Sequence, residues 1–191
     1  MNTRRSVSVP TTGMIAAETV ELYWRAWSEH DLDKLLSLLA PDFVSRSSLS
    51  QGRRADKTMV AAGFKMFDKA LPDLKEAIVS TIEEDGRVAC EVLETATFTG
   101  PMELPSGMIA PTNRSYRLPV ASFFSVNAQG LIVEQRTYWD TANWAEQIGI
   151  DPELFAPRPQ IASGSSRVGA LNVSPPQTPR IELGAHRKSP K

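Results

Sequence analysis

A carboxylate on an apolar strand face is the strongest chemical feature of this sequence. Glu94 alternates with Val92 and Ala96 in a predicted β-strand, so these side chains are expected on one face. Taking a carboxylate out of water disfavours its charged form, so we expect the pKa of Glu94 to rise toward neutrality. Such a group can take a proton from a carbon next to a carbonyl and return it. The alternative is that Glu94 faces outward and pairs with Arg117 or Arg136 across the sheet.

Polar side chains expected on the same interior face can assist this chemistry. A buried Tyr23 hydroxyl can donate a hydrogen bond to the enolate oxygen that forms when a carbon acid loses its proton. Tyr23 is equally compatible with a purely structural place in the core. The candidate catalytic residues are therefore Glu94 and Tyr23. The candidate substrate-binding residues, which occupy inward-facing strand positions, are Ser45, Ser47, Phe98, Ser122, Gln135, Thr137 and Trp139.

Other kinds of chemistry find little support in the sequence. Two distant histidines and one cysteine, Cys90, predict no metal site. The chain contains neither a glycine-rich phosphate loop nor a nucleophile elbow, so we expect no cofactor and no serine hydrolase activity. The Thr137 hydroxyl cannot act as a base at neutral pH; it either positions substrate or is an ordinary β-branched strand residue.

Hydrophobic periodicity predicts the elements that position these residues. Apolar residues recur at helical spacing from Met14 and again over 32–39 and 55–70, with Asp31 as a predicted N-cap. Asp85-Gly86 is typical of a hairpin turn, and Asp140 is expected to cap a last helix that stops at Gly149. Residues 100–114 are predicted to form a long loop, of the kind that often rims a site. The predicted strands span 43–47, 74–83, 87–99, 115–126 and 131–139.

This order predicts an α+β fold. Three N-terminal helices should pack on a curved antiparallel mixed sheet and form a cone-shaped roll with a pocket between helices and sheet. We expect a flexible N-terminus over residues 1–13, one domain over 14–155, and a disordered, basic, Pro/Ser-rich tail over 156–191.

Composition narrows the possible partners. The chain is 41% hydrophobic and 23% charged, which is ordinary for a globular protein. Its formal charge of −1 conceals an acidic domain and a basic tail, and an acidic domain argues against nucleic acid as a partner. No apolar run is long enough to span a membrane, and no apolar segment follows Arg4 and Arg5, so we expect no membrane partner and no secretory signal. With a single cysteine, the expected location is cytoplasmic.

Several segments resemble a known family. The phrase DLDKLLSLLAPDF, the ending GLIVEQRTYWDTANWAEQIG, and the tetrapeptides 97–100 (TFTG) and 111–114 (PTNR) are similar to SnoaL-like polyketide (ester) cyclases. These cyclases belong to the nuclear transport factor 2-like superfamily. The resemblance covers about residues 14–150 and implies the same cone-shaped roll.

The resemblance keeps some of the family's working positions and loses others. The pocket-facing tyrosine of the first helix falls on Tyr23 and is kept. The acid of the related epoxide hydrolases falls on Glu94, but its partner arginine falls on Val92. The catalytic aspartate of the cyclases falls on Thr137, and the histidine of the family's first tetrapeptide falls on Phe98. The resemblance therefore implies the fold more strongly than the activity.

Two functions follow as expectations. The first is a cofactor-independent isomerase, aldol-type cyclase or hydratase acting on a small apolar polyketide-like or terpenoid molecule. The second is a non-catalytic domain of the same fold that binds a hydrophobic ligand or mediates association. Epoxide hydrolysis is disfavoured because two of its three required groups are absent. The resemblance also implies a homodimer formed through the outer sheet face, with Arg117, Phe123, Arg136 and Tyr138 as its surface.

Overall fold

The computed structural model describes residues 12–50, 52–104 and 107–155. The predicted tail, 156–191, and most of the predicted flexible N-terminus lie outside these residues. The expected start of the first helix is wrong by two residues, because α1 begins at Thr12. In the described part of the chain, no helix is both long and apolar enough to cross a membrane.

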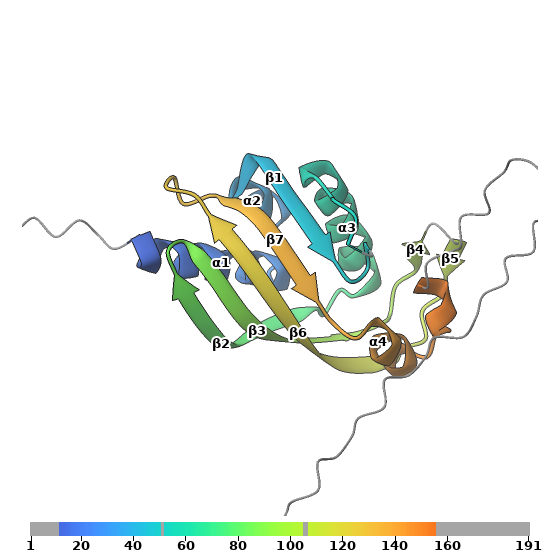
Figure 1. Ribbon diagram of the computed structural model, residues 1–191. Helices are drawn as coiled ribbons and strands as arrows, with labels where there is room; N and C mark the ends of the chain where they lie inside the picture. The colour runs from blue at the N-terminus through green and yellow to red at the C-terminus, as the bar shows by residue number, and fades with distance from the viewer. Residues whose placement is uncertain (1–11, 51, 105–106, 156–191) are drawn as a thin grey trace, which may run out of the picture. The chain divides into compact units, whose positions relative to one another are not determined.

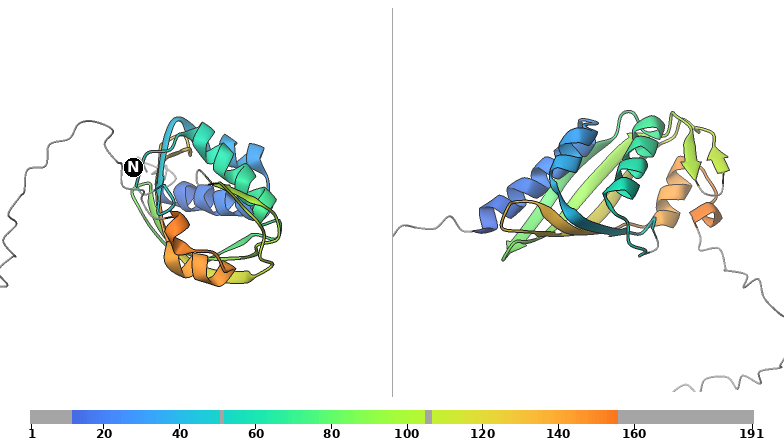
Figure 2. Two further views of the ribbon diagram at one scale, coloured as in Figure 1. Left: turned by 90° about the vertical axis from the view of Figure 1, so that its right-hand side faces the viewer. Right: turned by 90° about the horizontal axis from the view of Figure 1, so that it is seen from above.

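Three helices cover one face of the sheet (Figures 1 and 2). They are α1 (Thr12–Ser28), α2 (Leu32–Ser37) and α3 (Lys57–Ala70). The Asp31 side chain accepts a hydrogen bond from the Lys34 backbone N–H at 2.8 Å, as its predicted role as a cap requires. Asp56 caps α3 in the same way through the Met59 N–H at 2.9 Å. Helix α1 lies directly against β2, β3 and β6.

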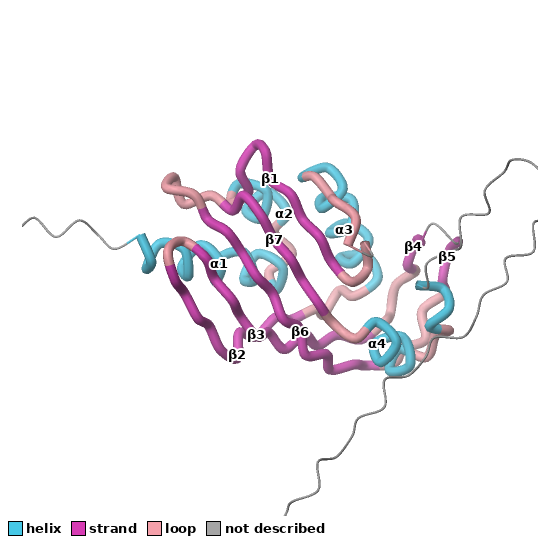
Figure 3. Tube along the Cα trace, viewed as in Figure 1, coloured by secondary structure: helices cyan, strands magenta, loops and turns pink. Residues whose placement is uncertain are grey.

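The main sheet has five strands in the order β1-β7-β6-β3-β2. The β1–β7 pair is parallel and the other pairs are antiparallel, so the sheet is mixed. The α+β fold with helices on a curved mixed sheet is therefore confirmed (Figure 3). The strands are β1 (Leu39–Ser47), β2 (Lys75–Glu84), β3 (Arg87–Thr97), β6 (Ser115–Val126) and β7 (Ile132–Tyr138).

Alternation of side chains places the core on the helix-covered face. Along β6, buried and exposed residues alternate from Ser115 to Phe124, as a half-buried antiparallel strand requires. The β2–β3 hairpin turns at Asp85-Gly86, where both residues have positive φ (49° and 73°) and suit a two-residue turn. The turn starts a regular register, with Glu84 opposite Arg87.

The structure departs most from the predicted elements at the first strand and in the loop 100–114. The first strand begins at Leu39 rather than Phe43, because Leu39 already pairs with Ile132 of β7 before an irregularity in the register. The predicted loop 100–114 contains a small hairpin of β4 (Met102–Leu104) and β5 (Gly107–Ile109). Three-residue strands are too short to give a periodic signal.

The small hairpin, α4 (Thr141–Ile148) and the 3₁₀ turn η1 (Pro152–Phe155) gather at one end of the sheet (Figure 1). Gly100 lets the chain pass directly over the end of α3, since a Cβ there would lie 1.8 Å from the Lys69 carbonyl oxygen. Thr112 ties the same end to α4 by donating a hydrogen bond to the Ile148 carbonyl at 2.5 Å. Asp140 caps α4 by accepting from the Asn143 N–H.

The outer face of the sheet carries exposed apolar side chains. Phe123 and Tyr138 lie edge to face with ring centroids 6.1 Å apart, and the Arg136 guanidinium lies 5.6 Å from the Phe123 ring. A hollow of about 380 Å³ lies beside them, with Val79 and Arg117 among its lining residues. The homodimer expected through this face stays a prediction.

Candidate active site

Glu94 lies on the inner, helix-facing side of β3. Its Oε1 accepts a hydrogen bond from the Tyr116 hydroxyl of β6 at 2.5 Å. Directly opposite it in the antiparallel register is Glu76 of β2. Glu94 therefore does not form the outward ion pair with Arg117 or Arg136 that was the alternative. It faces a second carboxyl group instead.

A β-bulge creates this pairing. From Glu84↔Arg87 to Ser80↔Glu91 the register follows the hairpin turn, and Val79 is then an extra residue in β2. After it, Ile78 pairs with Val92 and Glu76 with Glu94. Without the extra residue, the hairpin register would place Ala77 opposite Glu94. The two carboxyl groups meet because one residue is inserted in one strand.

The surroundings of the two glutamates raise their pKa values. Burial raises the pKa of Glu94, while hydrogen bonds with Tyr116 and Glu76 oppose part of that rise. Burial, the charge of Glu94 and a hydrogen bond with Glu94 raise the pKa of Glu76 well above its usual range. Burial and the Glu94 charge also raise the pKa of Tyr116, so this phenol keeps its proton. We call Glu76, Glu94 and Tyr116 the glutamate cluster.

Aromatic side chains extend from the glutamate cluster across three helices. The Tyr116 and Trp144 ring centroids lie 6.1 Å apart, and Phe67 of α3 lies 6.2 Å from Trp144. Trp27 of α1 follows at 6.3 Å from Phe67. Within the described residues, Oε2 of Glu76 and the Nε1 atoms of Trp27 and Trp144 are buried and make no hydrogen bond of full geometry. Each indole nevertheless lies close enough to a tyrosine hydroxyl, Trp27 to Tyr23 and Trp144 to Tyr116, to lower the pKa of that phenol. This end of the interior therefore holds two donors and an acceptor that make no full hydrogen bond.

A second polar group lies on the inner face of β1, β6 and β7. Gln135 Oε1 accepts hydrogen bonds from the Tyr23 hydroxyl at 3.1 Å and the Ser45 hydroxyl at 3.2 Å. Ser122 donates to the Thr137 hydroxyl at 3.0 Å. Burial raises the pKa of Tyr23 to about 12. We call these five residues the serine–glutamine cluster.

The remaining candidates occupy structural positions. Phe98 is fully buried in the core. The Ser47 hydroxyl accepts a hydrogen bond from the Ser50 N–H in the turn after β1. Trp139 is partly buried, and its backbone N–H binds the Ser48 hydroxyl at 3.0 Å.

The structure thus divides the sequence candidates between two places. Tyr23 and Ser45 bond to Gln135, and Ser122 bonds to Thr137, whereas Glu94 bonds to Tyr116. Sequence reasoning missed Glu76 and Tyr116. Tyr116 shares parity with Leu118 on its strand, which was a usable signal, but the bulge hides the parity of Glu76.

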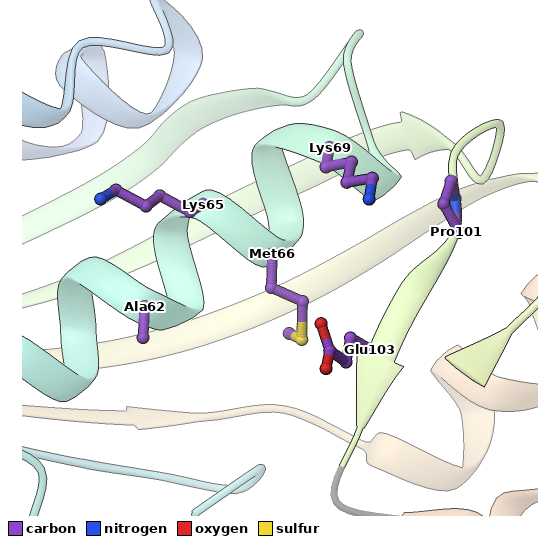
Figure 4. A pocket seen from close by; sticks show the side chains of 6 residues that line it. All are labelled: Ala62, Lys65, Met66, Lys69, Pro101 and Glu103. Atoms are coloured by element: carbon purple, nitrogen blue, oxygen red, sulfur yellow. The ribbon is translucent and has the colours of Figure 1, made fainter. Parts of the chain in front are cut away.

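Two hollows on the domain lie away from these clusters. One, of about 320 Å³, lies between α3 and the segment leading into β4, and Lys65, Met66, Lys69 and Glu103 are among its lining residues (Figure 4). The other is the outer-face hollow described above. Neither is lined by a candidate residue. However, Trp27, Phe67, Glu76 and Glu94 each keep partial exposure, so solvent reaches this part of the molecule.

The sequence matches the profile of the SnoaL-like domain over residues 20–135, which is more than half of the chain. The chain belongs to the SnoaL-like domain family. The resemblance inferred from the sequence is therefore confirmed. No curated protein matches the chain.

Solved structures share the fold of this SnoaL-like protein. IdmH, a proposed polyketide cyclase from Streptomyces antibioticus, is 21% identical with a TM-score of 0.60 and covers 71% of this chain and 99% of its own. A proposed SnoaL-like polyketide cyclase from Jannaschia sp. CCS1 is 19% identical with a TM-score of 0.62, covering 79% and 100%. AclR, a proposed hydroxylase from Streptomyces galilaeus, is 22% identical with a TM-score of 0.61, covering 70% and 80%. At these identities the likeness establishes the fold.

Proposed function

We propose that this SnoaL-like protein is an enzyme that moves a proton on a small apolar carbonyl compound, as an isomerase or aldol-type cyclase does, without a cofactor. The observation that carries the proposal is the inward-facing, partly exposed Glu94 carboxyl group, held by Tyr116. Its raised pKa makes it a stronger base than an ordinary carboxylate when it is ionised. The family and its relatives named as polyketide cyclases support the class of reaction.

In the proposed step, Glu94 removes a proton from the carbon next to the substrate carbonyl. The C–H bond breaks, an O–H bond forms on Glu94, and the electron pair moves into the carbonyl group as an enolate. An isomerase then returns the proton to another carbon. In a cyclase the enolate carbon instead attacks a second carbonyl, and Glu94 gives its proton to the resulting alkoxide.

The enolate oxygen needs a hydrogen-bond donor. Tyr23, the donor expected from the sequence, already donates to Gln135. The indole N–H groups of Trp27 and Trp144 make no hydrogen bond of full geometry, only weaker approaches to Tyr23 and Tyr116, and they belong to the aromatic side chains that extend from Glu94. A donor aimed at the developing charge stabilises the transition state more than the ground state. We assign this role to one of these two indoles and leave Tyr23 in the serine–glutamine cluster.

Deuterium exchange tests this proposal without knowledge of the natural substrate. 2-Tetralone, an apolar carbon acid with one carbonyl, is incubated with the protein in D₂O, and loss of its α-proton signals is followed by NMR. We expect exchange above the buffer rate that Glu94→Gln abolishes. Glu91→Gln, which changes the same kind of group on the exposed face of the same strand, should retain it. Equal rates for wild type and Glu94→Gln would reject Glu94 as the base.

A non-catalytic ligand-binding role is the second candidate. The observation in its favour is that Thr137, at the position where the resemblance implies a catalytic aspartate, is engaged with Ser122. Under this alternative, 2-tetralone would perturb the NMR signals of Trp27 and Trp144 but would exchange its protons only at the buffer rate. The exchange experiment therefore separates the two functions.

A further inference from the structure

Glu76 carries a buried acceptor atom, and neither the sequence analysis nor the proposed function has given this residue a role. It lies directly opposite Glu94 in the β2–β3 ladder. Opposed residues in an antiparallel pair have Cβ atoms about 4.5–5.5 Å apart, so their side chains interact directly. The Oε2 atom of Glu76 is buried and has no hydrogen-bond partner. Glu94, by contrast, already accepts a hydrogen bond from Tyr116.

The groups around the pair do not neutralise two negative charges. Glu94 and Cys90 act on Glu76 from β3, and Tyr116 acts on Glu94 from β6. From α1, the nearby titratable group is Tyr23, whose proton is held by burial. Lys75, the neighbour of Glu76 on β2, directs its ammonium group to the Ser28 carbonyl at 2.7 Å. Like charges directly opposite each other destabilise a sheet, and partial burial strengthens the repulsion.

We propose that Glu76 and Glu94 share one proton, which Glu76 carries and donates to Glu94 in the resting protein. The assignment of the proton follows from the contacts. Tyr116 gives Glu94 a hydrogen bond that stabilises its anion, whereas no donor in the described residues reaches Oε2 of Glu76. Glu76 is thus a positioning residue that acts through Glu94.

The shared proton has a consequence for the reaction, which rests on the function proposed above. Before the reaction the pair carries one negative charge. When Glu94 takes the substrate proton, both carboxyl groups are neutral and the charge is on the enolate. The partly buried pair thereby loses its charge as the base works, and the proton on Glu76 never leaves the protein. The Glu76 hydrogen bond also fixes the direction of the Glu94 carboxylate.

Infrared spectroscopy tests the shared proton independently of catalysis. A protonated carboxyl group absorbs separately from a carboxylate, so difference spectra between variants at neutral pH reveal which residue holds a proton. We expect a carboxylic-acid band in wild type that is lost in Glu76→Gln and kept in the control Glu91→Gln. Glutamine at position 76 still donates to Glu94, so the variant should fold, and circular dichroism checks this.

The outcomes are distinct. A carboxylic-acid band that Glu76→Gln removes supports the pair. Absence of the band in wild type at neutral pH, or a band that survives in a folded Glu76→Gln protein, overturns it. If the band behaves as expected while 2-tetralone does not exchange, the pair exists and the proposed enzymatic function fails. If exchange depends on Glu94 but the band is absent, Glu94 is the base and the two glutamates do not share a proton.

Discussion

The serine–glutamine cluster and the glutamate cluster occupy the inner face of one sheet, but they differ in how their hydrogen-bonding groups are used. In the first, the Tyr23 and Ser45 hydroxyls share one acceptor on Gln135, and Ser122 bonds to Thr137. In the second, Glu76 keeps a buried oxygen without a partner, and the nearby indole N–H groups of Trp27 and Trp144 make no hydrogen bond of full geometry.

This difference separates structure from function. A satisfied polar network rigidifies the core, because its groups exchange hydrogen bonds with water for hydrogen bonds with one another. An unpartnered buried polar group lowers stability and persists where another requirement maintains it. The residues that the family resemblance favoured lie largely in the satisfied network, while Glu76, which lies opposite Glu94, has an unpartnered buried oxygen, as His30 and Glu83 elsewhere have unpartnered buried atoms. We therefore place the chemistry at the glutamate cluster.

The sharpest contrast is in turnover. Glu94→Gln should lower the exchange rate of 2-tetralone by about 10²–10⁴-fold, the usual contribution of a general base. Tyr23→Phe should have a much smaller effect, because its hydroxyl is committed to Gln135. A larger loss of exchange rate in Tyr23→Phe than in Glu94→Gln would contradict our placement of the chemistry at the glutamate cluster.

The serine–glutamine cluster should matter for stability. Gln135→Leu removes the acceptor of two buried hydroxyls, on Tyr23 and Ser45, and should destabilise the protein by about 1–3 kcal/mol. Urea unfolding measures this, with the exposed Gln129→Leu as a control. A Gln135→Leu protein as stable as wild type would mean that this network does not support the core.

The glutamate cluster should lower stability as the pH rises. Glu76 ionises at the ordinary carboxyl pKa in the unfolded chain and well above it in the folded protein. The folded state therefore holds more protons in this window, and wild-type stability falls as pH increases through it. Glu76→Gln removes this loss, so its urea midpoint relative to wild type should rise from pH 4 to pH 8. A difference that is constant or falls with pH would contradict the raised pKa.

The smallest expected effect concerns the unused indoles. Trp27→Phe and Trp144→Phe keep an aromatic ring and remove one N–H each, so the substitution of the indole that donates to the substrate oxygen should weaken binding of 2-tetralone by about tenfold or less. Trp24→Phe is the matched control, because its Nε1 donates to Cys90 Sγ. Titration followed by NMR measures the affinities. Equal losses in all three variants would remove the special role of the unpartnered indoles.

Much of the fold could be predicted from local patterns. Helical spacing located α1 to α3, Asp31 and Asp140 marked two caps, and Asp85-Gly86 located the long hairpin. Each of these patterns depends only on residues close together in the sequence, and the folded protein contains the local structure that each pattern predicts. The β4–β5 hairpin was missed because its strands, of three residues each, are too short to show a periodic pattern.

The candidate site was only half predictable. Parity placed Glu94 among apolar neighbours, but the partner of Glu94 depends on a bulge at Val79, which a period-two pattern cannot reveal. A hairpin register without the bulge would have placed Ala77 opposite Glu94. Likewise, the sequence shows that Tyr23 can donate a hydrogen bond but not that Gln135 accepts it from 112 residues away.

The measurement that tests the central claim most directly is a pH titration of the glutamate side-chain carboxyl carbons by ¹³C NMR, with Glu94→Gln and Glu76→Gln spectra to assign the two signals. Our account predicts that these two resonances respond to each other and change at higher pH than the ordinary glutamate pKa would give. If both instead titrate at the ordinary glutamate pKa, the interior holds no carboxyl base of the kind proposed here.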